Sequence, residues 1–168
     1  MTFETLQTAR DGSAFVITLN RPDKRNAFSK QMMLEIADAC LEAEGDDRVR
    51  AVIITGGTKF FSAGADLNEA MAIKSTRDGV AYMKHWERVN ETVEKLDKPV
   101  IAAIEGFCVT GGFEFVLACD IRVAAQGASF ALTSSKIGTV PGAGGTQRLP
   151  RLIGTGKALD IMFSAESI

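Results

Sequence analysis

Residues 106–114, Gly-Phe-Cys-Val-Thr-Gly-Gly-Phe-Glu, bring free backbone N–H groups and a carboxylate within one helical turn. They follow an apolar stretch, residues 100–104, which predicts a fully buried strand, and precede residues 115–118, which predict a buried helix. A helix that begins near Gly111 has its first N–H groups without partners inside the helix, at the positive end of its dipole. Such groups suit a developing oxyanion, and Glu114 lies on the same face as Gly111. The segment therefore predicts the chemistry of an enolate beside an acid or base.

A second segment has the same design. Residues 51–56 predict another buried strand, and they are followed by residues 60–67, Phe-Phe-Ser-Ala-Gly-Ala-Asp-Leu. Gly64 and Ala65 have little or no side chain to block a ligand that approaches their backbone. Two N–H groups from separate turns can hold one oxygen, as an oxyanion hole does. Taken singly, each segment also fits a tight turn where a helix packs closely on a strand.

Short strands and helices alternate along the rest of the chain, which predicts a mixed α/β fold. Residues 14–19 predict a strand, and Ser29 predicts the N-cap of a helix that runs to about Glu44 and ends at Gly45. Residues 78–96 predict a second amphipathic helix, and residues 121–124 and 129–132 predict short strands. The expected apolar faces of the two helices are Met33, Ile36, Ala37, Cys40 and Leu41, and Tyr82, Trp86, Val89 and Val93.

Composition indicates an enzyme domain more than a nucleic-acid-binding one. The 168 residues are 46% hydrophobic with a formal net charge of −2, so we expect residues 1–168 to form one domain with a good core. Three cysteines at unrelated spacings and a single histidine, His85, predict neither disulfides nor a metal site. The sequence shows no targeting segment and no apolar run that could span a bilayer, so we expect a cytoplasmic protein without a membrane partner.

Five segments, in order, resemble the motifs of the enoyl-CoA hydratase/isomerase family, the crotonases. They are residues 20–28, 61–67, 106–114, 119–122 and 138–149, the last reading Gly-Thr-Val-Pro-Gly-Ala-Gly-Gly-Thr-Gln-Arg-Leu. The resemblance covers essentially the whole chain. It implies a crotonase-like spiral of repeated ββα units, and trimers or hexamers as the assembly.

The resemblance also assigns roles to residues. It implies that the N–H groups of Ala65 and Gly111 bind the thioester oxygen of an acyl-CoA, and that Glu114 is the first of two catalytic glutamates. Coenzyme A is then part of the substrate, and no separate cofactor is expected. Matching substrate-binding positions are Lys24 and Arg25, beside the CoA phosphates, and Ala27, Ala63, Gly64, Asp66, Leu67, Pro141 and Gly142. For Asp66, the residues themselves favour an N-cap of a short helix from Leu67.

One position departs from the family. The second glutamate is expected four residues before the Gly-Thr-Val-Pro-Gly stretch, where this chain has Ser134. Hydration of an α,β-unsaturated thioester needs a base for water and a proton source for C2, and a serine hydroxyl is a poor acid. One carboxylate can do both jobs in turn, so a hydratase-like lyase is the leading expectation. A double-bond isomerase is one alternative.

The second alternative is a non-catalytic acyl-CoA-binding or assembly subunit. The resemblance implies a C-terminal helical region beyond residue 168, which would cover the acyl pocket and help to build trimers. Its expected absence and the missing glutamate favour this alternative, whereas Glu114 and the two N–H donors favour an enzyme.

Overall fold

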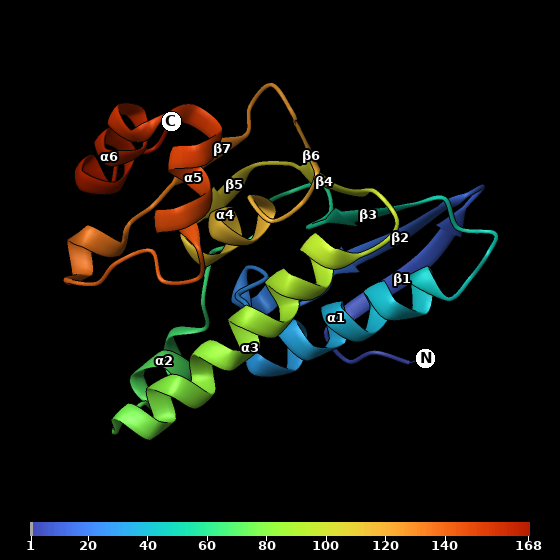
Figure 1. The fold of residues 1–168 in the computed structure, drawn as a ribbon, viewed down its shortest axis with the longest axis horizontal. Coiled ribbons are helices and arrows are strands. Elements are labelled where there is room, and N and C mark those ends of the chain that lie inside the picture. Colours follow the sequence, from blue (N-terminus) through green and yellow to red (C-terminus); the bar gives the residue numbers. More distant parts are fainter. Residues whose placement is uncertain (1) are drawn as a thin grey trace.

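The computed structural model describes residues 2–168, which form a mixed α/β fold with a five-stranded sheet in the order β1-β2-β3-β4-β6 (Figure 1). Strand β1 is antiparallel to β2, and the remaining neighbours in this sheet are parallel. Strands β5 and β7 form a separate parallel pair. The strands are β1 Leu6–Asp11, β2 Ala14–Leu19, β3 Ala51–Thr55, β4 Val100–Ile104, β5 Phe107–Val109, β6 Ile121–Ala124 and β7 Ser129–Ala131. The α-helices are α1 Lys30–Glu44, α2 Leu67–Met71, α3 Thr76–Lys95, α4 Gly111–Val116, α5 Gly145–Ile153 and α6 Thr155–Ser164.

Helices α1 and α3 lie side by side on one side of the sheet (Figure 1). The predicted start of α1 is confirmed, because the Ser29 Oγ accepts a hydrogen bond of 3.2 Å from the Met32 N–H. Helix α3 begins two residues earlier than expected, because Ser75 caps it through the Asp78 N–H. The expected burial of Leu41 is wrong: its side chain is 51% exposed, on a shallow surface groove between α1 and α3.

The prediction that residues 51–56 and 100–104 form fully buried strands is only half right. In both β3 and β4, buried residues alternate with half-buried ones. Both strands are central in the sheet, so their backbone hydrogen bonds are paired on each side. Because α1 and α3 lie on one side of the sheet, the side chains that point to the other face keep part of their surface accessible.

An aromatic cluster joins the segments that carry the expected functional residues. The ring of Phe28, fully buried, stacks on Trp86 of α3 at 5.3 Å between centroids. It also contacts Phe115 of α4 at 5.0 Å. The cluster therefore ties the turn before α1, the middle of α3 and the glycine-rich helix α4 into one core.

Candidate active site

The two glycine-containing segments meet. Gly64 has a φ of +98°, and a Cβ atom at this position would lie 3.2 Å from the Gly111 nitrogen. A Cβ atom on Gly111 would lie 3.1 Å from the Ala65 nitrogen and 2.8 Å from the ring of Trp86. Both positions therefore need glycine, one for its backbone conformation and both for the close approach. The two predicted donors, Ala65 and Gly111, lie side by side although they are far apart in the sequence.

Backbone pairing fixes the Ala65 segment from both sides. The Phe28 N–H donates to the Gly64 carbonyl at 2.7 Å, and the Asp66 N–H donates to the Phe28 carbonyl at 3.0 Å. This pairing leaves the intervening Ala65 N–H on the opposite edge. Within residues 2–168, neither this N–H group nor that of Gly111 has a hydrogen-bond acceptor. Two adjacent donors without acceptors form the arrangement that an oxyanion requires.

Strain next to Gly111 is held in place by hydrogen bonds. Thr110, which precedes helix α4, has a φ of +44°, a conformation that a β-branched residue rarely adopts. Its N–H donates to the Ala131 carbonyl at 2.7 Å, and its hydroxyl shares a hydrogen bond of 2.7 Å with that of Thr133. Strand β7 thus stabilises the turn that aims the Gly111 N–H.

Glu114 is the buried carboxylate of the site, with only 2% of its surface exposed. The Gly145 N–H donates to its Oε2 at 2.9 Å. Burial raises the pKa of Glu114 to about 7, although hydrogen bonds from the backbone of Gly145 and Ala143 and the charge of Arg148 act in the opposite direction. A group with this pKa exchanges protons near neutral pH, which suits a general acid or base.

The remaining positions near Ala65 are placed as follows. Asp66 caps α2 through the Asn68 N–H, as predicted, and also pairs with Arg21 at 3.0 Å. Ala27 and Ala63 are half-buried, and Gly64 is buried. The side chain of Leu67 is 64% exposed, and Lys24 and Arg25 are exposed. Exposure leaves these two cations accessible to a phosphate group.

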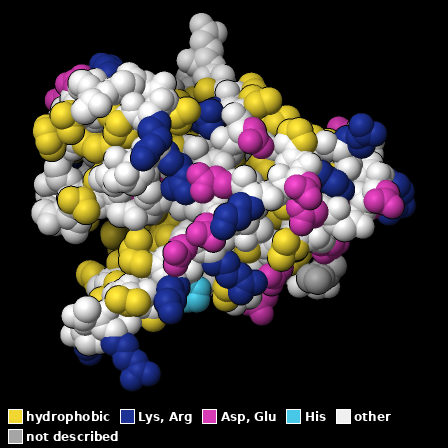
Figure 2. Space-filling view, viewed as in Figure 1, with side chains coloured by type: hydrophobic (Ala, Val, Ile, Leu, Met, Phe, Trp, Pro, Cys, Tyr) yellow, Lys and Arg dark blue, Asp and Glu magenta, His cyan; other side chains and the backbone are white. Residues whose placement is uncertain are grey.

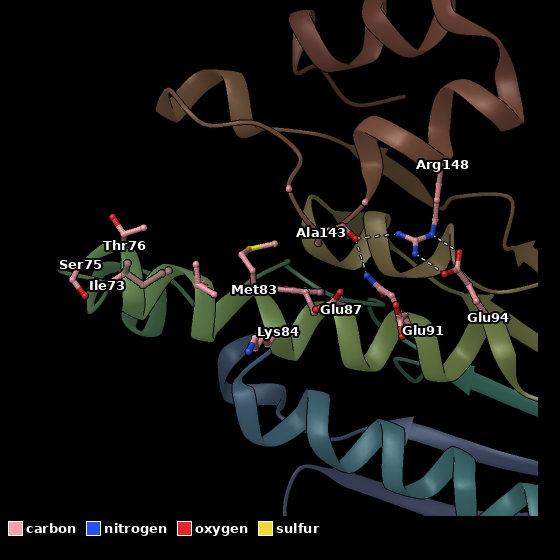
Figure 3. A pocket seen from close by; sticks show the side chains of 16 residues that line it. Ile73, Ser75, Thr76, Met83, Lys84, Glu87, Glu91, Glu94, Ala143 and Arg148 are labelled. Carbon is pink, nitrogen blue, oxygen red and sulfur yellow. Dashed lines mark hydrogen bonds and ion pairs between the residues drawn. The ribbon is translucent and has the colours of Figure 1, made fainter.

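A groove of about 830 Å³ runs between α3 and residues 142–148 (Figure 3). Gly142 lines it, whereas Pro141 is buried behind Gly145. The space-filling view shows a hollow with hydrophobic side chains there, beside a band of charges along α3 (Figure 2). Ala65, Gly111 and Glu114 do not line the groove themselves. Trp86 connects the two regions, because its ring forms part of the groove wall and lies against Gly111.

Ser134 lies in a short 3-10 turn, Ser134–Ile137, and is 2% exposed. Within residues 2–168, its hydroxyl makes no hydrogen bond to Glu114. Its carbonyl accepts from the Thr139 N–H at 3.0 Å, which closes the turn. Ser134 and Glu114 are therefore not joined by a hydrogen bond in this structure.

The sequence analysis gave no role to five residues around Glu114. Gly145 bonds to Glu114 directly, and the other four bond to one another across α3 and α5: Asn90, Glu94, Ala143 and Arg148. One signal was present for Asn90, a polar residue four positions after Trp86 on the apolar face of α3. It is 3% exposed, and its Nδ2 donates to the Ala143 carbonyl at 2.7 Å. The contact joins residues 53 positions apart, so local sequence does not indicate the partner.

Comparison with known proteins shows the family of this chain. Residues 9–168 match the family model for enoyl-CoA hydratase/isomerase, and the chain belongs to this family. The fold is accordingly the crotonase fold. The chain is similar to the solved structure of an enoyl-CoA hydratase from Bacillus anthracis, with a TM-score of 0.92 and 37% identity. The match covers 98% of this chain and 64% of that one.

Two relatives illustrate the closeness in sequence. A short-chain-enoyl-CoA hydratase of Clostridium acetobutylicum is 42% identical over 95% of this chain and 61% of its own length. A crotonyl-CoA hydratase of Syntrophomonas wolfei is 39% identical over all of this chain and 65% of its own length. The chain therefore spans less than two thirds of these relatives.

Within residues 2–168, no helix is both long and apolar enough to cross a membrane. Assembly into trimers or hexamers stays a prediction.

Proposed function

We propose that this protein is an enoyl-CoA hydratase-like lyase, which adds water to an α,β-unsaturated acyl-CoA thioester or removes it. The observation that carries the proposal is the meeting of the Ala65 and Gly111 N–H groups in the same core as the buried carboxylate of Glu114. Relatives named as hydratases of short enoyl-CoA thioesters support the substrate class.

The proposed reaction uses one carboxylate twice. Ionised Glu114 accepts a proton from water as the water oxygen bonds to C3, and the electron pair of the double bond moves onto the thioester oxygen. The N–H groups of Ala65 and Gly111 stabilise the resulting enolate. Protonated Glu114 then delivers its proton to C2, so one water molecule has been added and the carboxylate is restored. A pKa of about 7 suits both steps, because neither protonation state of Glu114 is strongly disfavoured.

Substrate placement follows from the surroundings of the site. We propose that the acyl group enters the groove beside Trp86. Ile73 and Met83 give this groove an apolar lining. Exposed Lys24 and Arg25 are the proposed contacts to CoA phosphates, because both retain free cationic surface on the turn before α1. Coenzyme A belongs to the substrate in this proposal, and no other cofactor takes part.

The direct test is incubation with crotonyl-CoA and with a longer enoyl-CoA. We expect loss of the conjugated thioester absorbance, together with a product heavier by one water molecule. Migration of the double bond without added water would replace the hydratase by an isomerase. Saturable binding without any product would leave an acyl-CoA-binding protein and contradict the proposal.

Ser134 permits a test of the missing second glutamate. We expect Ser134→Glu to raise the hydration rate at least about tenfold, because a second carboxylate separates the acid and base tasks that we assign to Glu114. Ser134→Gln is the matched control, since it has the same size without the charge. The two rates are compared in variants whose melting temperatures agree. Equal rates for both variants would contradict the proposal that the missing second carboxylate limits the hydration rate.

A further inference from the structure

The backbone that holds Glu114 is itself held by α3. Arg148 of α5 makes a two-pronged ion pair with Glu94 of α3: its Nε lies 2.6 Å from Oε1, and its Nη2 lies 2.7 Å from Oε2. The third guanidinium nitrogen donates to the Ala143 carbonyl at 3.3 Å. A planar fork with both oxygens engaged fixes direction as well as distance.

The same carbonyl is bonded a second time. Asn90, also on α3, donates its Nδ2 to the Ala143 oxygen at 2.7 Å, and Figure 3 shows these contacts converging on Ala143. We call the contacts of Asn90 and Glu94 with Ala143 and Arg148 the α3–loop contact. Two residues after Ala143, the Gly145 N–H donates to Glu114.

The intervening Gly144 is shaped for this arrangement. Its φ is +114°, and a Cβ atom there would lie 1.7 Å from Nη1 of Arg148. The guanidinium therefore packs directly on the backbone between Ala143 and Gly145, and the positive φ favours glycine there. The guanidinium thus lies within two residues, along the backbone, of the N–H group that binds Glu114.

The charge of Arg148 also affects Glu114. Among residues 2–168, Arg148 is the charged side chain that acts on Glu114, and it lowers the pKa that burial raises. Arg148 is faced in turn by Glu94 from α3 and by Glu114 from α4. Along the groove, α3 also carries Lys84, Glu87 and Glu91, of which Glu91 pairs with Lys95 at 3.0 Å.

We propose that Arg148 and Glu94 are positioning residues for Glu114: through the α3–loop contact they fix the Gly145 N–H and place one partly neutralised cation beside the carboxylate. The proposal rests on the proposed function for its kinetic consequences but not for its geometry. The competing interpretation is an ion pair that only fastens α5 to α3 and leaves Glu114 unaffected.

The test separates the charge of Arg148 from its shape. We expect Arg148→Gln to move the acid limb of the kcat/KM profile for crotonyl-CoA to higher pH by about one unit, because the cation that favours ionised Glu114 is lost. We expect kcat to fall about tenfold with KM within about twofold, since Gly145 is held less firmly. Arg148→Lys keeps the charge without the fork, so its acid limb stays near that of the wild type while kcat remains low.

A second variant is expected to shift the acid limb in the opposite direction. In Glu94→Gln, Arg148 keeps its contact with the Ala143 carbonyl but loses its anionic partner, so its charge acts more strongly on Glu114. We expect the acid limb to move to lower pH. Arg151→Gln is the matched control, because Arg151 is an exposed arginine of the same helix that bonds to Gln147, and its profile is expected to match the wild type.

A readout independent of turnover completes the experiment. Carbon-13 NMR of labelled glutamate side chains, assigned with Glu114→Gln, follows the titration of Glu114 directly. An unchanged Glu114 titration in folded Arg148→Gln and Glu94→Gln would overturn the proposal and leave a structural ion pair. If the wild type hydrates no enoyl-CoA, the proposed function fails, yet the same titrations still decide whether the α3–loop contact controls Glu114.

Discussion

Glu114→Gln is expected to lower kcat for hydration of crotonyl-CoA by about 10³-fold, with little change in the affinity for CoA thioesters. The reason is that the amide keeps the size of the side chain and can still accept from the Gly145 N–H, but it neither takes a proton from water nor delivers one to C2. The measurement is the initial rate at saturating substrate, with ligand affinity determined separately by calorimetry.

The control for this variant is Glu105→Gln, which removes an exposed carboxylate just before the glycine-rich segment. It is expected to behave like the wild type. A turnover number for Glu114→Gln that equals the control would exclude Glu114 as the acid and base. In the wild type, kcat/KM should rise with pH through about 7 if the ionised form is the base, which follows from the pKa of this group.

Gly111→Ala is expected to lower kcat/KM by about 10²-fold or more, the scale of losing one oxyanion donor. The added methyl group would lie 2.8 Å from the Trp86 ring and 3.1 Å from the Ala65 nitrogen. It therefore forces the two N–H groups apart or intrudes on the space between them. Steady-state kinetics with crotonyl-CoA provide the measurement, and a melting curve shows whether the variant stays folded.

Gly156→Ala serves as the matched control, because nothing lies within 4 Å of a Cβ atom at this glycine and it has no positive φ. Its kinetics are expected to equal those of the wild type. If Gly111→Ala were folded and fully active, the Gly111 N–H would not be part of an oxyanion hole.

Much of the architecture could be predicted because it depends on local patterns. The Ser29 cap, the apolar face of α3 and the Asp66 cap of α2 each involve residues within a few positions of one another. Strand β5 was not predicted, since its three residues provide too short a pattern, and its pairing with β7 is a long-range contact. Leu41 was expected to be buried but is exposed, because helical periodicity does not indicate which part of a helix face a neighbouring helix covers.

The candidate site divides in the same way. Ala65, Gly111 and Glu114 could be named from small residues and a carboxylate at strand ends, and the structure brings Ala65 and Gly111 together. The ion pair of Glu94 and Arg148 joins residues 54 positions apart, and both side chains would be read as ordinary surface charges from sequence. The pair forms because α3 and α5 lie together in the fold, and local sequence patterns do not predict this contact.

Trp86 is the single tryptophan of this chain, and its ring lies between the groove and Gly111. Its intrinsic fluorescence therefore originates beside the proposed oxyanion donors, with no second indole to obscure it. A thioester bound at this pair of N–H groups would change the surroundings of the ring, so we expect the emission maximum and intensity to report occupancy without any label. Rapid-mixing fluorescence can then time the arrival of the ligand separately from the chemical step, in the wild type and in inactive variants alike.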